Sequence, residues 1–313
     1  MNKQRFPDEF RLKPGDRVGL IACSNGLSPD RQGEIQALVS LLREWGLEPV
    51  CSPCLYAREG GAFSGSGKER AQALLDFYQD DAIRGIFDLS GGDLANQVLP
   101  FLDYGVLARH SKPFFGYSDL TALLNGVYAQ TGLPGGLYQL RNLLGPAGEA
   151  QRRAFFRSFF DGTGDLLDFP FSFLQGDAME GVVAGGNLRC LLKLAGTPYW
   201  PDLTGKLLFL EARSGLVPQL STMLEQLSQL GAFRQVAGIL LGTFTQMERE
   251  AAHPRAEALL LPYLPKNLPV AKTPAIGHGS DSKCLLIGKR LLLSKKEGLA
   301  ICPLQGHHER NSA

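Results

Sequence analysis

Short apolar runs alternate with amphipathic segments along the first 145 residues of the chain. Buried strands are expected at residues 16–22, 47–50, 85–89 and 112–116. Helices are expected at residues 28–45, 68–79 and 95–102, and again from residue 118 onward. This alternation is typical of a mainly parallel sheet covered by helices, which binds ligands beyond the carboxyl ends of its strands. We therefore predict an N-terminal α/β domain at residues 1–145.

The pattern weakens after this domain and then changes. Residues 146–180 are rich in Phe, Gly and Pro and are expected to form a connection, while residues 181–305 carry more strand signals. The elements expected in this second part are strands at 206–210 and 236–241, a helix at 218–230, and two strands meeting near a tight turn within 285–293. The predicted fold class is α/β, with a mainly parallel N-terminal sheet and flanking helices, followed by a C-terminal β-rich α+β domain.

Composition excludes several classes of protein. The 313 residues carry a net charge of +1 without a basic patch, which argues against nucleic-acid binding. No apolar run approaches the roughly 20 residues of a membrane-spanning helix, and no apolar segment follows the basic N-terminus as in a secretory signal. No phosphate-binding glycine motif follows the first strand, so neither a nucleotide nor another cofactor is expected.

Six cysteines are scattered along the chain, unlike the dense framework of a small secreted domain. We expect reduced thiols and a cytoplasmic protein. Cys51 and Cys54 form a C-x-x-C, but no second pair accompanies them as in a structural zinc site. They also precede a Gly-rich loop rather than a helix start, so two loop cysteines are the preferred interpretation over a redox pair.

Ser118 stands where a buried strand is expected to turn into a helix. The first N–H groups of a helix lack internal partners and carry partial positive charge, so a serine here can lie beside the N–H of Asp119 as the nucleophile of a strand–turn–helix elbow does. The G-x-S-x-G pattern of such elbows is not met, because position 120 is Leu120. Serine is also a preferred N-cap residue, and from these residues alone a capping role is the favoured interpretation.

A nucleophilic serine needs a base, a group that orients the base, and donors for the oxyanion. Among five histidines, His278 between two glycines is the best candidate base, whereas His307 and His308 lie in a polar tail. Glu211 ends an apolar strand, where it either orients the base or faces solvent. Gly92, after another strand end, either offers a backbone N–H to the oxyanion or simply makes a tight turn.

Taken in order, these stretches resemble the serine-type LD-carboxypeptidase family, which includes muramoyltetrapeptide carboxypeptidases and microcin C immunity peptidases. The most specific match is Gly116-Tyr117-Ser118-Asp119-Leu120-Thr121-Ala122-Leu123. Further matches lie at residues 12–16, 63–65, 69–71, 90–92, 99–104, 185–188, 196–198, 208–211 and 277–279.

The resemblance implies a serine carboxypeptidase that removes a terminal D-amino acid, D-Ala in murein tetrapeptide, after an L-centre, in cell-wall recycling. It implies that Ser118 is the nucleophile, His278 the base and Glu211 its partner. It also implies an oxyanion hole formed by the N–H groups of Asp119 and Gly92. Family members are typically homodimers that use no metal, so a murein peptide and a second copy of the chain are the expected partners, with no nucleic acid and no membrane.

The chain departs from the family pattern after Glu211, at residues 212–215, and after the nucleophile helix, at residues 136–141. The family resemblance therefore leaves open which substrate the protein acts on. One alternative is an immunity-type peptidase that cleaves peptidyl or aminoacyl nucleotides. Another is a non-catalytic ligand-binding protein on the same fold.

Overall fold

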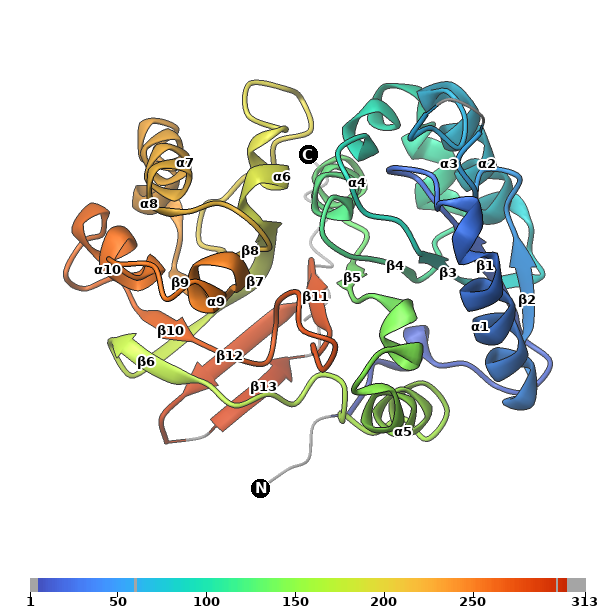
Figure 1. The fold of residues 1–313 in the computed structure, drawn as a ribbon. Coiled ribbons are helices and arrows are strands. Elements are labelled where there is room, and N and C mark those ends of the chain that lie inside the picture. The colour runs from blue at the N-terminus through green and yellow to red at the C-terminus, as the bar shows by residue number, and fades with distance from the viewer. Residues whose placement is uncertain (1–4, 59–60, 297, 303–313) are drawn as a thin grey trace, which may run out of the picture.

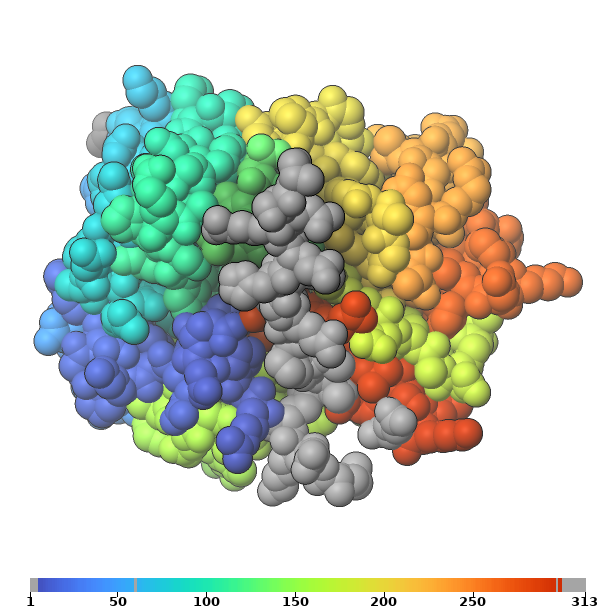
Figure 2. Space-filling view, turned by 180° about the vertical axis from the view of Figure 1, so that it is seen from behind, coloured from blue at the N-terminus to red at the C-terminus, as the bar shows by residue number. Residues whose placement is uncertain are grey.

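The structure, a computed structural model, describes residues 5–58, 61–296 and 298–302. It contains two sheets that lie side by side, each with its own helices (Figure 1). From behind, the blue-to-teal surface of the N-terminal elements also lies beside the yellow-to-red surface of the C-terminal ones (Figure 2). The predicted α/β class with a second, β-rich unit is confirmed.

The first sheet has six strands in the order β11-β5-β4-β3-β1-β2. Neighbouring strands among β1 to β5 are parallel, as predicted, and β11 pairs antiparallel with β5. The strands are β1 (Arg17–Ile21), β2 (Glu48–Cys51), β3 (Ile83–Asp88), β4 (Phe114–Gly116), β5 (Gly135–Leu137) and β11 (Leu285–Ile287).

Helices connect the parallel strands and cover the first sheet (Figure 1). These are α1 (Gln32–Glu44), α2 (Gly67–Gln79), α3 (Tyr104–Arg109), α4 (Leu120–Thr131) and α5 (Gly148–Phe159), with 3-10 turns η1 (Asp8–Phe10), η2 (Pro29–Arg31), η3 (Ala95–Gln97), η4 (Leu99–Phe101) and η5 (Leu140–Leu144). The helix predicted over residues 95–102 is wrong, because the chain forms the two short turns η3 and η4 there. Pro100 has no N–H to donate to a continuing helix and disfavours helical angles at the residue before it.

The second sheet has seven strands in the order β13-β12-β7-β8-β9-β10-β6. Its centre, β7 to β10, is parallel, and its outer pairs are antiparallel. The strands are β6 (Ser172–Gln175), β7 (Ala178–Asn187), β8 (Leu207–Ala212), β9 (Gly238–Phe244), β10 (Val270–Lys272), β12 (Arg290–Ser294) and β13 (Gly298–Cys302). The helices are α6 (Leu188–Leu192), α7 (Val217–Gln229), α8 (Ala232–Gln235), α9 (Thr245–Arg249), α10 (Ala256–Leu260) and the 3-10 turn η6 (Leu261–Tyr263).

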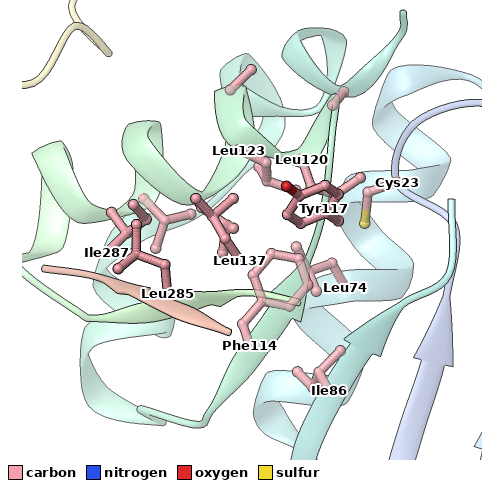
Figure 3. Packing of buried hydrophobic residues seen from close by; sticks show 14 of the residues in the cluster. Cys23, Leu74, Ile86, Phe114, Tyr117, Leu120, Leu123, Leu137, Leu285 and Ile287 are labelled. Carbon is pink, nitrogen blue, oxygen red and sulfur yellow. The ribbon is translucent and has the colours of Figure 1, made fainter. Parts of the chain in front are cut away.

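Residues 285–293 form two strands, as predicted, but the strands do not pair with each other. β11 joins β5 in the first sheet, whereas β12 pairs with β7 and β13 in the second. The chain therefore crosses from one sheet to the other at Gly288 and Lys289. Leu285 and Ile287 of β11 share one hydrophobic cluster with Leu137 of β5 and Leu123 of α4 (Figure 3).

The same hydrophobic cluster also contains Leu207 and Phe209 of β8. Both side chains are fully buried, so apolar burial holds the two sheets together as well as stabilising each one. The apolar contact between the sheets fixes the relative position of their strand ends, where the candidate site lies.

Five cysteines, Cys23, Cys51, Cys54, Cys190 and Cys284, are free thiols in the structure. Cys51 is exposed at the end of β2, and Cys54 is buried in the loop that follows, so only one of the two is a loop cysteine as expected. Within the described part of the chain, each helix is too short or too polar to span a bilayer.

Candidate active site

Three of the residues singled out from the sequence meet where strand ends of the two sheets face each other. Ser118 follows β4, Glu211 lies in β8, and His278 lies in the segment between β10 and β11. Ser118 Oγ is 3.0 Å from Nε2 of His278. Nδ1 of the same ring is 2.7 Å from Oε2 of Glu211. A hydroxyl, an imidazole and a carboxylate in this order form the constellation that activates a serine nucleophile.

Ser118 adopts a backbone conformation that few non-glycine residues adopt. Its φ is +60°, in the left-handed region, which costs on the order of 1–3 kcal/mol when the surrounding structure enforces it. The capping interpretation is wrong, because Asp119 is the N-cap residue of α4 and no side chain caps this helix. The Ser118 carbonyl accepts from the Thr121 N–H, while its hydroxyl faces His278. The sharp turn thus presents the hydroxyl, as in a nucleophile elbow.

Glu211 does not face solvent, because the residue is only 1% exposed. Its Oε2 pairs with His278, and its Oε1 accepts from Nδ2 of Asn187 at 2.9 Å. A carboxylate held on both oxygens can fix the imidazole with Nδ1 protonated, which leaves Nε2 to accept a proton from Ser118.

Asn187 is a residue whose part in the site the sequence did not reveal, although it stands in the matched Gly185-Gly186-Asn187-Leu188 stretch. It ends β7 and caps α6 through a hydrogen bond from the Cys190 N–H. Its own N–H donates to Oγ1 of Thr121 in the nucleophile helix at 2.9 Å. Asn187 therefore connects the Ser118 helix to the carboxylate that orients His278.

The loop carrying His278 packs closely on β9. A Cβ at Gly277 would lie 1.7 Å from Oγ1 of Thr243, so only glycine permits this approach. The His278 ring meets the buried Tyr117 ring edge-on, with centroids 5.1 Å apart. Close backbone packing and this ring contact hold the imidazole toward Ser118.

The turn after β3 lies against the nucleophile, since a Cβ at Gly91 would come within 3.9 Å of the Ser118 Cβ. Gly92 has φ +129°, and a side chain there would collide with Oδ1 of Asn25. Among the residues that the structure describes, the N–H groups of Gly92 and Asp119 donate no hydrogen bond. Both N–H groups are therefore available to a ligand, one in the residue after Ser118 and the other in the neighbouring glycine turn.

A buried carboxylate holds this turn in place. Asp88, at the end of β3, is fully buried and accepts from the Cys23 N–H at 2.6 Å and the Ser90 N–H at 2.8 Å. Burial raises the pKa of Asp88, and these hydrogen bonds oppose that rise. Asp88 thus organises the loops after β1 and β3, a role that its position in an apolar strand did not reveal.

A pocket of ≈560 Å³ opens beside the strand end that carries Glu211. Arg189 borders it and also donates to the Gly92 carbonyl at 3.3 Å, which places the pocket next to the glycine turn. Its remaining lining combines neutral polar and apolar side chains, namely Ser214, Leu216, Gln219, Thr222, Met223 and Gln246, together with Gly215.

Within the described ranges, no group of three or more His, Cys, Asp or Glu residues is placed to hold a metal ion. His307 and His308 lie outside those ranges. No cofactor role is assigned to any residue of the site.

Comparison with known proteins agrees with this geometry. Residues 18–139 match the model of the LD-carboxypeptidase N-terminal domain, and residues 180–293 match that of the LD-carboxypeptidase C-terminal domain. A Bacillus subtilis protein named "Probable murein peptide carboxypeptidase" is 28% identical, over 93% of this chain and 92% of its own. The Escherichia coli microcin C7 self-immunity protein MccF is 26% identical, over 90% of this chain and 91% of its own.

A solved structure of MccF in an inactive mutant, ligand-free state aligns with a TM-score of 0.81 at 24% identity. The alignment covers 92% of this chain and 96% of that one, so the two-sheet fold is shared nearly throughout. The two matched ranges cover most of both sheets and include Ser118, Glu211 and His278. The chain belongs to the LD-carboxypeptidase family of serine peptidases.

Proposed function

We propose that the protein is a serine LD-carboxypeptidase that removes a terminal D-amino acid, D-Ala in murein tetrapeptide, after an L-centre. The observation that carries the proposal is the chain of contacts from Ser118 Oγ through the His278 ring to Glu211, at 3.0 and 2.7 Å. A hydroxyl hydrogen-bonded to a carboxylate-held imidazole is poised for acyl transfer.

In the first step, Ser118 Oγ attacks the carbonyl carbon that precedes the terminal residue. His278 Nε2 takes the hydroxyl proton as the C–O bond forms, and Glu211 stabilises the imidazolium. Negative charge develops on the carbonyl oxygen, where the N–H groups of Asp119 and Gly92 donate to it. Each such donor contributes roughly 10²–10³ in rate in serine peptidases.

The tetrahedral intermediate then collapses. His278 gives its proton to the leaving amine, the C–N bond breaks, and the free D-amino acid departs, leaving an acyl ester on Ser118. A water molecule, deprotonated by His278, attacks the ester and regenerates the Ser118 hydroxyl. Both half-reactions use the same imidazole, so the mutual position of Ser118 and His278 governs the whole cycle.

The printed name of the Bacillus subtilis relative supports a murein peptide as substrate and a part in cell-wall recycling. We propose the pocket bordered by Arg189 as the place of the acyl part of such a peptide, because it opens beside the strand end that carries Glu211 and combines polar with apolar side chains. We also propose that the protein is a cytoplasmic homodimer. We further propose an N-terminal domain at residues 1–145, a connection at 146–180 and a C-terminal domain at 181–305, and the two matched ranges support this division.

A second candidate is an immunity-type peptidase that cleaves peptidyl or aminoacyl nucleotides. The full-length similarity to MccF favours it, together with the departures from the family pattern at residues 136–141 and 212–215 that border the site. The chemistry at Ser118 would be the same, and only the substrate would differ.

A panel of substrates separates these functions. The purified protein is incubated with the murein tetrapeptide, with its counterpart ending in L-Ala, and with an aminoacyl sulfamoyl adenosine, and the released products are quantified by mass spectrometry. We expect release of D-Ala alone, and only from the first peptide. Hydrolysis of the nucleotide analogue alone would establish the second candidate, and hydrolysis of none would favour a ligand-binding protein without catalytic activity.

A further inference from the structure

The short helix α6, which follows β7 of the second sheet, brings the side chains of Arg189 and Lys193 into contact with loops of the first sheet. Arg189 of α6 ion-pairs with Oδ1 of Asp93 and donates to the Gly92 carbonyl at 3.3 Å. Lys193, at the end of α6, donates from Nζ to the Asp93 carbonyl at 2.9 Å and to Oδ1 of Asp119 at 2.5 Å. Both residues proposed above as oxyanion donors, Gly92 and Asp119, are therefore contacted from the opposite sheet.

The Asp119 carboxylate is completely buried, and each of its oxygens is engaged. Oδ2 accepts from Ser24 Oγ at 2.6 Å and from the Ala95 N–H at 2.8 Å, which ties it to the loops after β1 and β3. Oδ1 accepts from Lys193, whose side chain is 17% exposed. Lys193 is the cation in hydrogen-bond contact with this carboxylate, while Arg70 and Arg189 act on it only through longer-range attraction. Its direct contact matters because a poorly compensated charge is strongly unfavourable in a protein interior.

This charge balance matters because the carboxylate and the proposed oxyanion donor belong to the same residue. In the proposed reaction, negative charge develops on the substrate carbonyl oxygen that accepts from the Asp119 N–H. The carboxylate of the same residue lies nearby. An uncompensated carboxylate would repel the developing oxyanion in a site with little solvent to screen it. Without Lys193, the turn from Ser118 to Asp119 would also lose the contact that fixes its position relative to α6.

We propose that Lys193 is a positioning residue for the oxyanion hole, acting through Asp119. This inference rests on the proposed serine peptidase function and deepens it. Lys193 neutralises the Asp119 carboxylate and holds it so that the N–H groups of Asp119 and Gly92 converge on one point. Docking of α6 onto the first sheet is thus a requirement for catalysis as well as for stability.

The test compares steady-state kinetics of Lys193 variants on the substrate that the wild type hydrolyses. Lys193→Met is expected to lower kcat ten- to a hundredfold with KM changed less than threefold, because the lost interaction acts at the transition state. Lys193→Gln, which keeps a donor but no charge, is expected to lower kcat with a melting temperature near that of the wild type. Lys193→Arg is expected to retain most of kcat.

The double variant Asp119→Asn with Lys193→Met separates charge balance from general damage. With no buried carboxylate left to compensate, its kcat is expected to exceed that of Lys193→Met alone. Lys289→Met is the matched control, since Lys289 is also mostly buried and joins distant segments through Glu9, away from the site. Its kcat is expected to equal that of the wild type.

The inference is overturned if Lys193→Met and Lys193→Gln keep the kcat of the Lys289→Met control, or if the double variant is slower than Lys193→Met. Failure of the proposed function gives a different pattern, in which the wild type releases no product or Ser118→Ala is as active as the wild type.

Discussion

Nδ1 of His278 lies 2.7 Å from Oε2 of Glu211, although the two residues are 67 positions apart in the chain. The other carboxylate oxygen is held by Asn187, so Glu211 has a single orientation toward the ring. This arrangement favours the tautomer in which Nδ1 carries the proton and Nε2 faces the Ser118 hydroxyl as an acceptor. We therefore expect catalysis to depend on Glu211 as well as on Ser118.

Replacement of Glu211 by glutamine should lower the catalytic rate severely. Because Asn187 Nδ2 donates at the Oε1 position, the glutamine amide oxygen is held there and its NH2 group faces Nδ1 of His278. The NH2 group cannot accept from Nδ1–H, so the ring loses both its tautomer preference and the stabilisation of its protonated form. We expect kcat to fall by about 10⁴, the magnitude seen when an orienting carboxylate becomes an amide in such triads. The measurement is kcat on the hydrolysed substrate, with the melting temperature as a folding control. A value of kcat within tenfold of the wild type would exclude Glu211 from this role.

Asn187→Ala should affect both activity and stability. It leaves Oε1 of Glu211 buried without its donor and removes the cap of α6, which together should cost about 2–4 kcal/mol of stability. We expect kcat to fall at least tenfold, because the released carboxylate no longer holds His278 in one position. Urea unfolding and kinetics measure the two effects, with Asn267→Ala, at an exposed position, as the control. Wild-type kcat in folded Asn187→Ala would contradict this account.

Strands β1 to β4 could be predicted from local patterns, because each is a short run with apolar residues bounded by turn signals. The short strand β5, Gly135–Leu137, was not predicted, since two of its three residues are glycines and give no apolar pattern. Ser118, Glu211 and His278 could be singled out because each stands at a strand end or between glycines within a matched stretch, and the structure brings their side chains within hydrogen-bond distance. The pairing of β11 with β5 could not be predicted, since it is a long-range contact between sheets. The contacts of Asn187 and Lys193 are equally non-local, and nothing in their neighbouring residues indicates them.

The left-handed backbone of Ser118 makes a prediction about stability. Alanine at this position retains the strain of φ +60°, whereas glycine adopts that angle freely. We expect Ser118→Gly to be more stable than Ser118→Ala by about 1 kcal/mol in denaturant unfolding, although both are inactive. Equal stability, or a less stable glycine variant, would argue against strain at this turn.

Glu69 makes the stability depend on pH at the start of α2. Hydrogen bonds from the Ser66 backbone N–H, together with those from Arg58 and the Ser66 side chain, lower the pKa of Glu69 from 4.5 to about 2. A carboxyl with a lowered folded pKa stabilises the protein above its unfolded pKa, and this contribution is lost as pH falls through the folded value.

The difference in urea midpoint between the wild type and Glu69→Gln should therefore be constant above pH 5 and shrink between about pH 4.5 and 2. Unfolding curves across this range measure it, with Glu149→Gln on an exposed helix surface as a control. A difference that does not change with pH would show that the ionised Glu69 has no special role in the folded protein.

Ser118 is the proposed nucleophile of a carboxypeptidase, and every other role in the site depends on it. The most direct measurement is the rate of D-Ala release from murein tetrapeptide by the wild type and by Ser118→Ala, both shown to be folded by their melting curves. We expect D-Ala release by the wild type and a rate at least 10³ lower in the variant. Release of D-Ala by Ser118→Ala at the wild-type rate would contradict it.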